Sequence, residues 1–244
     1  MKTSTMPKTS VLMSAALGFI NLAIAANPSY AVGINFSTWS SSGDVTTPSV
    51  GSANLSTDGL NSDDFPANNG TFSFTGTVPA TDAFFSTTLQ DFLGLSATSL
   101  DTSDFAYEGS ALKFTFNANG GDKLTFDYNF LTNDLLNIDY SFLLVNGSVI
   151  TLADVSNALN SSSFFANETG TTPFSYTFTK SGTYTVGLGV VDIGDNNVTS
   201  ALKISNAELV TTTAVPFEFD PALGLGAMGA VWAFKQAKKK MAKR

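Results

Sequence analysis

One stretch of the sequence decides the fold: Lys123-Leu124-Thr125-Phe126-Asp127-Tyr128-Asn129-Phe130. Polar and apolar residues alternate through it, and successive side chains of a β-strand point to opposite faces of a sheet. Its apolar side chains would therefore share one buried face. The earlier stretch Leu112-Lys113-Phe114-Thr115-Phe116 has the same period, so its apolar side chains would also share a face. A turn at Gly120-Gly121-Asp122 predicts that the two stretches form a hairpin.

Further segments of strand length follow, separated by clusters of Gly, Asn, Asp, Ser and Thr. Asn146-Gly147 predicts a hairpin turn, and short helices are expected at Leu89–Leu93 and Leu152–Leu159. The pattern predicts an all-β fold, an antiparallel β-sandwich of jelly-roll type with short helices and a C-terminal hydrophobic helix. The remaining predicted strands are Thr71–Thr75, Ser141–Val145, Val149–Leu152, Phe174–Thr179, Tyr184–Val191 and Ala201–Leu209.

The composition supports one packed domain. Hydrophobic residues make up 43% of the 244 residues and charged residues 13%, and the 21 Phe supply ample apolar surface for a core. We expect most of these rings to be buried. The alternative for Trp39 and Tyr107 is an exposed aromatic platform that binds sugars.

The chain contains neither cysteine nor histidine. It therefore has no thiolate nucleophile, no disulfide, no imidazole base and none of the usual zinc ligands. Most hydrolase mechanisms are excluded on this basis, and we expect a protein that is not an enzyme.

The formal net charge of -8 is unevenly distributed. Lys2 and Lys8 precede the first apolar run, and six basic residues lie in the last ten positions. The central part of the chain, between these ends, contains only four lysines and nearly all the acidic residues. The central domain should therefore repel nucleic acid and attract cations.

Residues 1–31 have the pattern of a secretory signal: basic residues, the apolar run 11–26, and small residues suited to signal peptidase. Two cleavage positions fit, after Ala25 or after Ala31. We prefer the second because Val32-Gly33-Ile34-Asn35-Phe36 would then open the mature chain as a strand. The predicted organisation is a signal at 1–31, a β-sandwich ectodomain at 32–211 and a C-terminal segment at 212–244.

The C-terminal segment has three parts, a short motif, the uncharged run 222–234 and a basic cluster. The short motif is formed by Val215, Pro216, Phe217, Glu218, Phe219 and Pro221. The motif and the order of the three parts resemble the C-terminal sorting signals of the PEP-CTERM class, in particular the cyanobacterial variant with Pro-Phe-Glu.

The resemblance implies export by the general secretion machinery and recognition of the tail by an exosortase, a membrane-embedded enzyme that supplies the nucleophile itself. The motif residues would then serve recognition and not catalysis. The basic cluster would act as a stop-transfer signal, formed by Lys235, Lys238, Lys239, Lys240, Lys243 and Arg244.

Physical chemistry favours a membrane anchor at the same place. The uncharged run 222–234 is shorter than the roughly 20 residues that cross a bilayer, so it can span only by tilting or by thinning the bilayer. Basic residues after the run would hold the C-terminus in the cytoplasm and the acidic domain outside. The strand segments 121–132, 184–195 and 200–206 are also similar to ectodomains that precede such anchors.

Two loops are rich in oxygen ligands. One loop contains Asp192, Asp195, Asn196 and Asn197, which form a candidate calcium site, and Asp134 with Asp139 flank another loop. The alternative is ordinary turn chemistry, since Asp and Asn often hydrogen-bond their own backbone in turns.

Paired carboxylates also raise the possibility of a glycosidase. The pairs are Asp63 with Asp64, and Asp104 with Glu108, and turn or surface roles explain both as well.

The sequence favours an exported, exosortase-sorted protein of the cell envelope or extracellular matrix, with a non-enzymatic adhesion or matrix domain. The alternatives are a calcium-dependent carbohydrate-binding module, whose partner would be an envelope polysaccharide, and a glycoside-active enzyme.

Overall fold

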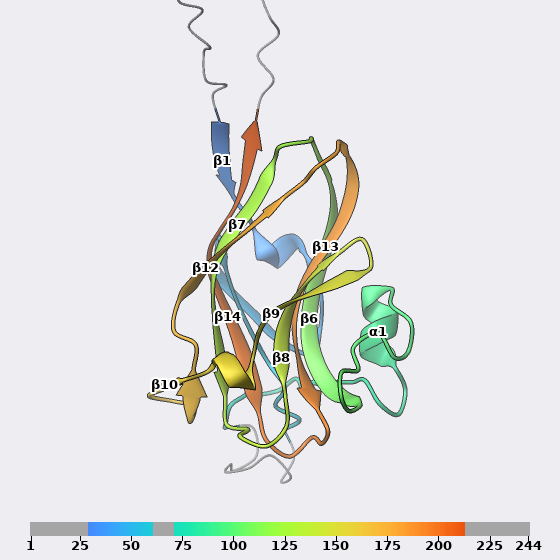
Figure 1. The fold of residues 1–244 in the computed structure, drawn as a ribbon, viewed down its shortest axis with the longest axis vertical. Coiled ribbons are helices and arrows are strands. Elements are labelled where there is room, and N and C mark those ends of the chain that lie inside the picture. The colour runs from blue at the N-terminus through green and yellow to red at the C-terminus, as the bar shows by residue number, and fades with distance from the viewer. Residues whose placement is uncertain (1–28, 61–70, 213–244) are drawn as a thin grey trace, which may run out of the picture.

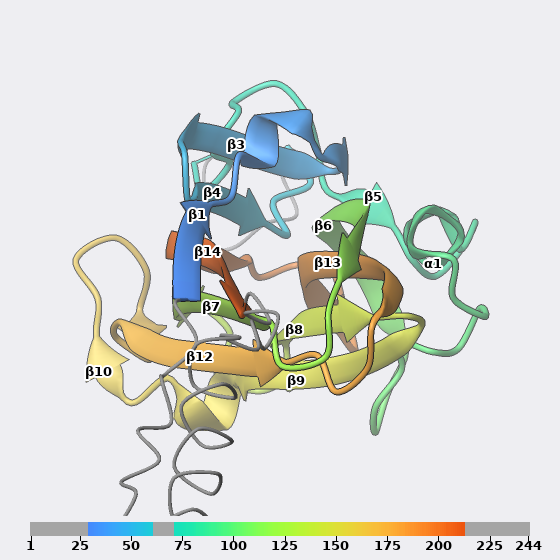
Figure 2. The same cartoon turned by 90° about the horizontal axis from the view of Figure 1, so that it is seen from above.

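A computed structural model describes residues 29–60 and 71–212 of the protein, and they form two antiparallel β-sheets packed face to face (Figures 1 and 2). The predicted antiparallel β-sandwich is confirmed. The eight-stranded first sheet contains β1 (Ser29–Gly33), β3 (Asp44–Ser49), β4 (Ser52–Ser56), β7 (Lys123–Thr132), β10 (Asn160–Ser161), β11 (Asn167–Glu168), β12 (Thr172–Thr177) and β14 (Ser200–Thr212). The six-stranded second sheet contains β2 (Ser40–Ser42), β5 (Thr81–Asp82), β6 (Ala106–Ala118), β8 (Tyr140–Val145), β9 (Ser148–Asp154) and β13 (Gly182–Ile193).

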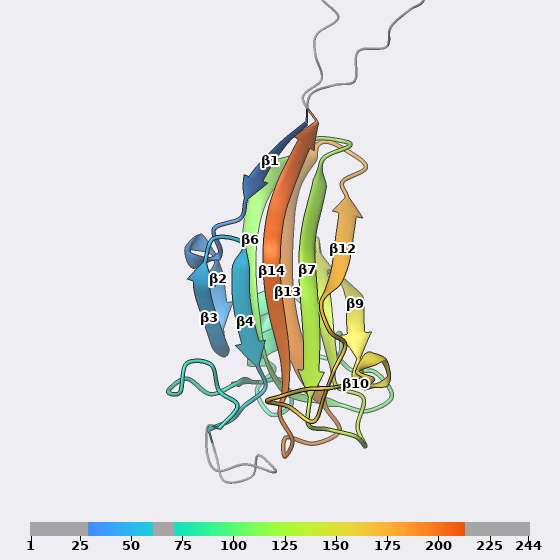
Figure 3. The same ribbon diagram turned by 90° about the vertical axis from the view of Figure 1, so that its left-hand side faces the viewer.

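In both sheets, strands that are neighbours in space are often distant in the sequence. The first sheet runs β10-β11-β7-β14-β4-β3, with β1 also paired to β14 and β12 to β7. The second runs β2-β6-β13-β8-β9, with β5 paired to β6. Figure 3 shows β4, β14 and β7 side by side in the first sheet. Within the described ranges the helical elements are α1 (Thr88–Leu93) and the 3-10 turns η1 (Phe36–Thr38) and η2 (Val155–Asn157).

The alternating pattern of 123–130 produces the core between the sheets. Leu124, Phe126, Tyr128 and Phe130 are all buried, as predicted, whereas the polar residues between them lie on the outer face. Each fully buried ring of this kind contributes about 1.5–3 kcal/mol relative to an exposed one. In the 112–116 stretch Leu112 is buried, but Phe114 remains 41% exposed because it lies at the sheet surface against Trp39.

A second apolar cluster covers the outer face of the second sheet. Leu89 and Leu93 of α1 belong to this cluster together with Ala111 of β6 and Phe142 and Leu144 of β8, and the helix itself lies against β5 and β6. Since β8 is buried on both faces, all six of its residues are inaccessible. The helix predicted at 89–93 is thus confirmed, and it serves to cover this face.

The hairpin predicted at Asn146-Gly147 is also confirmed. It joins β8 to β9, with Val145 opposite Ser148. Asn146 and Gly147 have φ angles of +48° and +81°, the left-handed pair that a two-residue hairpin turn requires.

The hairpin predicted between the 112–116 and 123–130 stretches is wrong. β6 pairs with β13 in the second sheet, and β7 pairs with β14 and β12 in the first. The turn between them therefore carries the chain from one sheet to the other. Asp122 holds this turn, because its carboxylate accepts hydrogen bonds from the backbone N–H groups of Asn119 at 2.8 Å and Thr212 at 2.9 Å.

Residues 71–75 form no strand, contrary to their alternating pattern. Their backbone N–H groups donate to buried carboxylates instead of to a neighbouring strand. Phe72 N donates to Asp58 at 2.9 Å, and Phe74 N and Thr75 N donate to Asp44 at 2.7 and 2.8 Å.

The helix predicted at 152–159 is wrong as well. β9 continues to Asp154, because Ala153 and Asp154 pair with Ser141 and Tyr140 of β8. Only the 3-10 turn η2 follows, and the Asp154 side chain caps it by accepting from Ser156 N at 2.8 Å.

β1 begins at Ser29 and not at Val32, where a strand was expected to open the mature chain. It pairs with the last residues of β14, so the start of β1 and the end of β14 lie at the same end of the sandwich (Figure 1). None of the helices in the described ranges is long and apolar enough to cross a membrane. The sorting motif, the uncharged run and the basic cluster lie outside the described residues, as does most of the predicted signal.

Candidate metal centre

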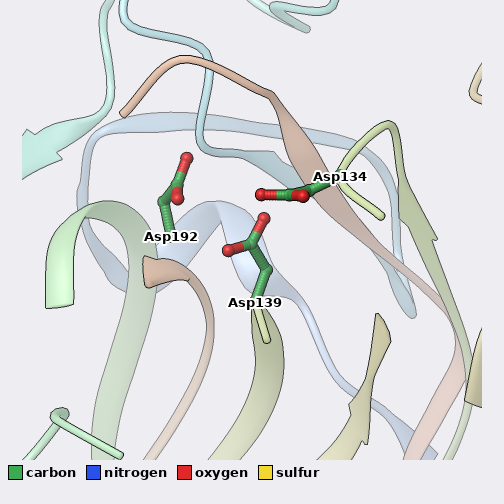
Figure 4. A group of neighbouring side chains, drawn as sticks. All are labelled: Asp134, Asp139 and Asp192. Carbon is green, nitrogen blue, oxygen red and sulfur yellow. The ribbon is translucent and has the colours of Figure 1, made fainter. Parts of the chain in front are cut away.

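Three aspartates meet at the end of the sandwich away from β1. The connections from β7 to β8 and from β13 to β14 cross between the sheets there. Asp134 lies in the first connection, Asp139 directly precedes β8, and Asp192 is the second-last residue of β13. Figure 4 shows the three side chains converging on one space. One carboxylate oxygen of each lies within 4.8 Å of the other two.

Asp134 forms hydrogen bonds with residues of its own loop. Its Oδ1 accepts hydrogen bonds from the N–H groups of Leu136 at 2.6 Å and Asn137 at 3.1 Å. Its own N–H donates to Thr132 Oγ1 at 2.9 Å. Its Oδ2 is buried and accepts no hydrogen bond from any residue that the structure describes. One oxygen therefore organises the loop and the other faces the cluster.

Asp139 connects both sheets to the cluster. Its Oδ1 accepts from Ile193 N at 2.9 Å, at the end of β13, and its Oδ2 accepts from Ser200 Oγ at 2.6 Å, at the start of β14. Burial raises the pKa of this carboxyl from 3.8 to about 7, with the nearby charge of Asp134 acting in the same direction. The hydrogen bonds from Ser200 and Ile193 oppose the rise in pKa only in part.

Asp192 is the most unusual of the three. It is fully buried, and neither of its oxygens accepts a hydrogen bond within the described ranges. Its pKa is raised well above 3.8, first by burial and then by the negative charges of Asp139 and Glu108. Glu108 lies opposite Asp192 in the pairing of β6 with β13. The surroundings of this carboxylate thus add negative charge where a buried anion needs positive charge.

Other buried aspartates of the protein are satisfied by hydrogen bonds. Asp44 accepts from Phe74 N, Thr75 N and the hydroxyl groups of Ser56 and Ser73. Asp58 accepts from Leu60 N at 2.8 Å and Phe72 N at 2.9 Å. These residues, which the sequence did not single out, hold loops. The contrast shows that the fold can satisfy a buried carboxylate, and that it does not do so for Asp192.

The cluster has the chemistry of a site for a hard cation. Calcium binds carboxylate, carbonyl and water oxygens at about 2.3–2.6 Å, so two ligands on opposite sides of the ion are about 5 Å apart. The observed limit of 4.8 Å between carboxylate oxygens fits an ion held among all three side chains. The unpartnered oxygens of Asp134 and Asp192 are the atoms that would coordinate it.

The structure combines residues that the sequence placed in two separate sites. Asp192 joins Asp134 and Asp139, whereas Asp195, Asn196 and Asn197 lie in the following loop. Asp195 accepts from Asn197 N at 2.8 Å and from Asn137 Nδ2 at 2.5 Å, which is the turn chemistry considered as the alternative. Calcium binding itself stays a prediction.

The other candidate residues are dispersed. Asp104 is exposed, Glu108 lies beside Asp192, and Asp63 and Asp64 are outside the described residues. Of the two aromatic candidates, Trp39 is half-buried and stacks on Phe114 at 5.9 Å. Tyr107 is half-buried and stacks on Phe84 at 4.8 Å.

Comparisons with known proteins identify no family for this chain. No protein-family model matches the chain. No curated protein matches it either. Among solved structures it is similar to TmCBM61 in complex with β-1,4-galactotriose, at 10% identity and a TM-score of 0.31, over 72% of this chain and 89% of that one. It is also similar to a CBM4 structure at 13% identity and a TM-score of 0.23, over 44% of this chain and 83% of that one. Likeness this low carries no inference about a ligand.

Proposed function

We propose that this protein is an exported, non-catalytic β-sandwich module of the cell envelope or extracellular matrix, and that a calcium ion bound by Asp134, Asp139 and Asp192 stabilises it. The observation that carries the proposal is the full burial of Asp192 with both oxygens unpartnered among the described residues. An unpaired carboxylate in the protein interior is strongly unfavourable, and a divalent cation removes that penalty.

The position of the cluster gives the ion a structural role. β7 and β14 belong to the first sheet, and β8 and β13 to the second. The ion would therefore link two of the connections that cross between the sheets at this end. Removing it would loosen the two loops first and the sheet contact next to them second.

The burial of the cluster supports a structural role over a catalytic one. Asp134, Asp139 and Asp192 are at most 2% exposed. A glycosidase needs its two carboxyl groups on either side of a bound sugar. A polysaccharide cannot reach these carboxyl groups without opening the sandwich.

Sorting by an exosortase is part of the proposal and rests on the residues around Pro216, Phe217 and Glu218. The end of β14, from which such a tail would continue, lies beside β1, and the β7–β8 and β13–β14 connections that carry the candidate metal centre lie at the opposite end (Figure 1). An anchor after β14 would thus hold the module with its metal-bearing loops facing outward.

The experiment that tests the calcium part is thermal unfolding of the full chain in calcium, in magnesium and in chelator. Calcium at about 100 times its Kd should stabilise the fold by about 2.7 kcal/mol. For a domain of this size that corresponds to a rise in Tm of about 5–10 °C. Magnesium should stabilise less, because it prefers to keep several water ligands. Equal Tm values in calcium and chelator would contradict the proposal.

The sorting part is tested separately by the intact mass of the protein in membrane, wall and secreted fractions of its native host. We expect a mature mass that lacks both the leader and the residues beyond the Pro216-Phe217-Glu218 region. A mature mass that still includes residues 235–244 would show a simple tether instead.

A further inference from the structure

The outer face of the first sheet is hollowed along β7 and β14. One hollow of 340 Å³ lies toward β12, and its lining includes Thr125, Asp127, Pro173, Ser175 and Asn206. Polar sheet faces are ordinary in antiparallel sandwiches, because one side of a sheet commonly faces water. The lining also includes Phe126 and Phe174, so the depression combines hydrogen-bonding side chains with apolar surface, which is a more specific feature.

A second hollow of 300 Å³ follows the first along the same strands, toward β4 and β3. Asn54, Asn129, Thr171, Lys203 and Ser205 are among the residues that line it. Residues 125–127 of β7 line the first hollow and residues 128–129 the second, and on β14 Asn206 lines the first and residues 203–205 the second. The two hollows therefore form one surface, which we term the polar groove.

Four side chains form a row across the first sheet, each directly opposite the next in the sheet register, and Asn54, Lys203 and Asn129 of this row line the groove. Thr46 of β3 pairs with Asn54 of β4, which pairs with Lys203 of β14, which pairs with Asn129 of β7. Three strand spacings separate the ends of this row, about 14 Å. The row thus offers hydroxyl, amide and ammonium groups at regular intervals on one face.

Hydrogen bonds hold both amides of the row in place. Asn54 Nδ2 donates to Thr46 Oγ1 at 3.2 Å. Asn129 Nδ2 donates to Glu168 at 3.1 Å, and Asn129 Oδ1 accepts from Thr169 Oγ1 at 3.2 Å. Side chains ordered in advance lose less entropy when a ligand binds.

A β-bulge interrupts the pairing of β14 with β7 at the other hollow, between Ser205 and Glu208. Asn206 there has a φ of +53°, and its Nδ2 donates to Asp127 at 2.8 Å. Two backbone hydrogen bonds stabilise the bulge. Ala207 N donates to Gly51 O at 3.1 Å, and Ala207 O accepts from Ile34 N at 2.9 Å. Bulges of this kind re-aim a side chain and are frequent beside binding sites.

From this geometry we propose that the polar groove binds a neutral polysaccharide chain. The proposal goes beyond the calcium-stabilised module and is independent of the ion, since the groove lies along the strands and not in the metal-bearing loops. Hydroxyl groups of a saccharide can both donate and accept, which suits a surface of amides and hydroxyls. Asp127 and Lys203 carry opposite charges in the groove, so the match is to an uncharged ligand and not to a polyanion.

The test is affinity electrophoresis of the full chain through gels that contain galactan, xyloglucan or laminarin, with alginate as an anionic comparison, in calcium and in chelator. We expect at least one neutral polysaccharide to retard the protein. Asn129→Ala and Lys203→Met should each weaken the apparent affinity about tenfold, the loss of roughly one hydrogen bond to the ligand.

Matched controls lie away from the groove. Asn117→Ala changes an exposed Asn on β6 of the second sheet, and Lys180→Met changes an exposed lysine between β12 and β13; both should leave retardation unchanged. Phe85→Ser removes a ring that is 84% exposed beside Phe84, where a sugar platform would be the competing site. Thermal unfolding of every variant confirms that it is folded.

Three results would overturn the proposal. These are no retardation in any neutral gel, retardation in alginate alone, and retardation lost in Phe85→Ser but kept in both groove variants. If calcium does not raise the Tm of the protein but a neutral polysaccharide still retards it, the proposed function is contradicted and the groove assignment stands.

Discussion

Asp134 and Asp192 come from opposite sheets of the sandwich, and their carboxylate oxygens lie within 4.8 Å of each other. Asp134 follows a strand of the first sheet and Asp192 belongs to a strand of the second. Asp139 lies within the same distance of both. Three negative groups at this spacing, each with almost no exposure, repel one another unless a cation or protons lie between them.

Replacing Asp192 by Asn should change stability in opposite directions with and without calcium. In chelator at pH 8 the variant should unfold at a higher temperature than wild type, because it no longer buries an unpaired acid. In calcium it should unfold about 5–10 °C lower, because a ligand of the ion is lost. Thermal unfolding monitored by circular dichroism measures both values.

Asp91→Asn is the control for that comparison. Asp91 is an exposed residue of α1, so the same change of charge should leave Tm within about 2 °C in both conditions, as for most surface substitutions. A parallel loss of stability for Asp192→Asn in calcium and in chelator would show that Asp192 has a packing role without a metal.

Without a metal, the protein should lose stability as pH rises. The folded pKa of Asp139, about 7, lies above the value of 3.8 expected when unfolded, and the pKa of Asp192 is raised too. The folded state therefore holds protons that the unfolded state has released, and this contribution is complete below about pH 4 and lost as pH rises through 7. For Asp139 alone the change is on the order of 4 kcal/mol.

Urea unfolding in chelator at pH 5 and pH 8 measures this dependence. We expect a lower midpoint at pH 8, and recovery of the midpoint at pH 8 when calcium is added. A midpoint in chelator that rises from pH 5 to pH 8 would contradict the account of the two carboxyls.

Gly189 should tolerate no side chain. It lies opposite Phe142 in the pairing of β13 with β8, and a Cβ there would come within 2.3 Å of the Phe142 ring. Gly189→Ala should therefore destabilise the fold by about 1–3 kcal/mol through overpacking. Gly182→Ala in the same strand is the control, because its nearest neighbour would be Tyr184 at 4.0 Å. Equal Tm values for the two variants would refute this packing argument.

Glu218→Ala should impair processing of the C-terminal tail in the native host and leave the sandwich folded. The prediction rests on the resemblance of 215–219 to the Pro-Phe-Glu sorting motif. Intact mass of the mature protein measures processing, and circular dichroism measures the fold. An unchanged mature mass and unchanged retention at the cell surface would count against recognition of this residue.

The periodic strands were predictable because alternation is a local property. The buried face of 123–130 and the hairpin at Asn146-Gly147 both follow from residues close in sequence. The strand that pairs with β6 could not be predicted in this way, because Gly120-Gly121-Asp122 suits a turn between sheets as well as a hairpin. Residues 71–75 have the pattern of a strand, but their backbone N–H groups donate hydrogen bonds to the Asp44 and Asp58 carboxylates instead of to a neighbouring strand.

The candidate site was predictable only in part for the same reason. The sequence marks Asp134 with Asp139 and Asp192 with Asp195 as two acidic loops. Their meeting depends on two crossings between the sheets, which no local pattern encodes. Whether an aspartate is satisfied, as Asp195 is by Asn197 and Asn137, also depends on the folded structure.

The most direct test of the central claim is isothermal titration of calcium into chelator-treated full chain, beside the Asp192→Asn variant. We predict one ion bound per wild-type chain and a loss of affinity of at least about a hundredfold in the variant, since one carboxylate ligand is worth several kcal/mol in a buried site. No binding to the wild type, or equal affinity for both proteins, would contradict a calcium ion held by Asp134, Asp139 and Asp192.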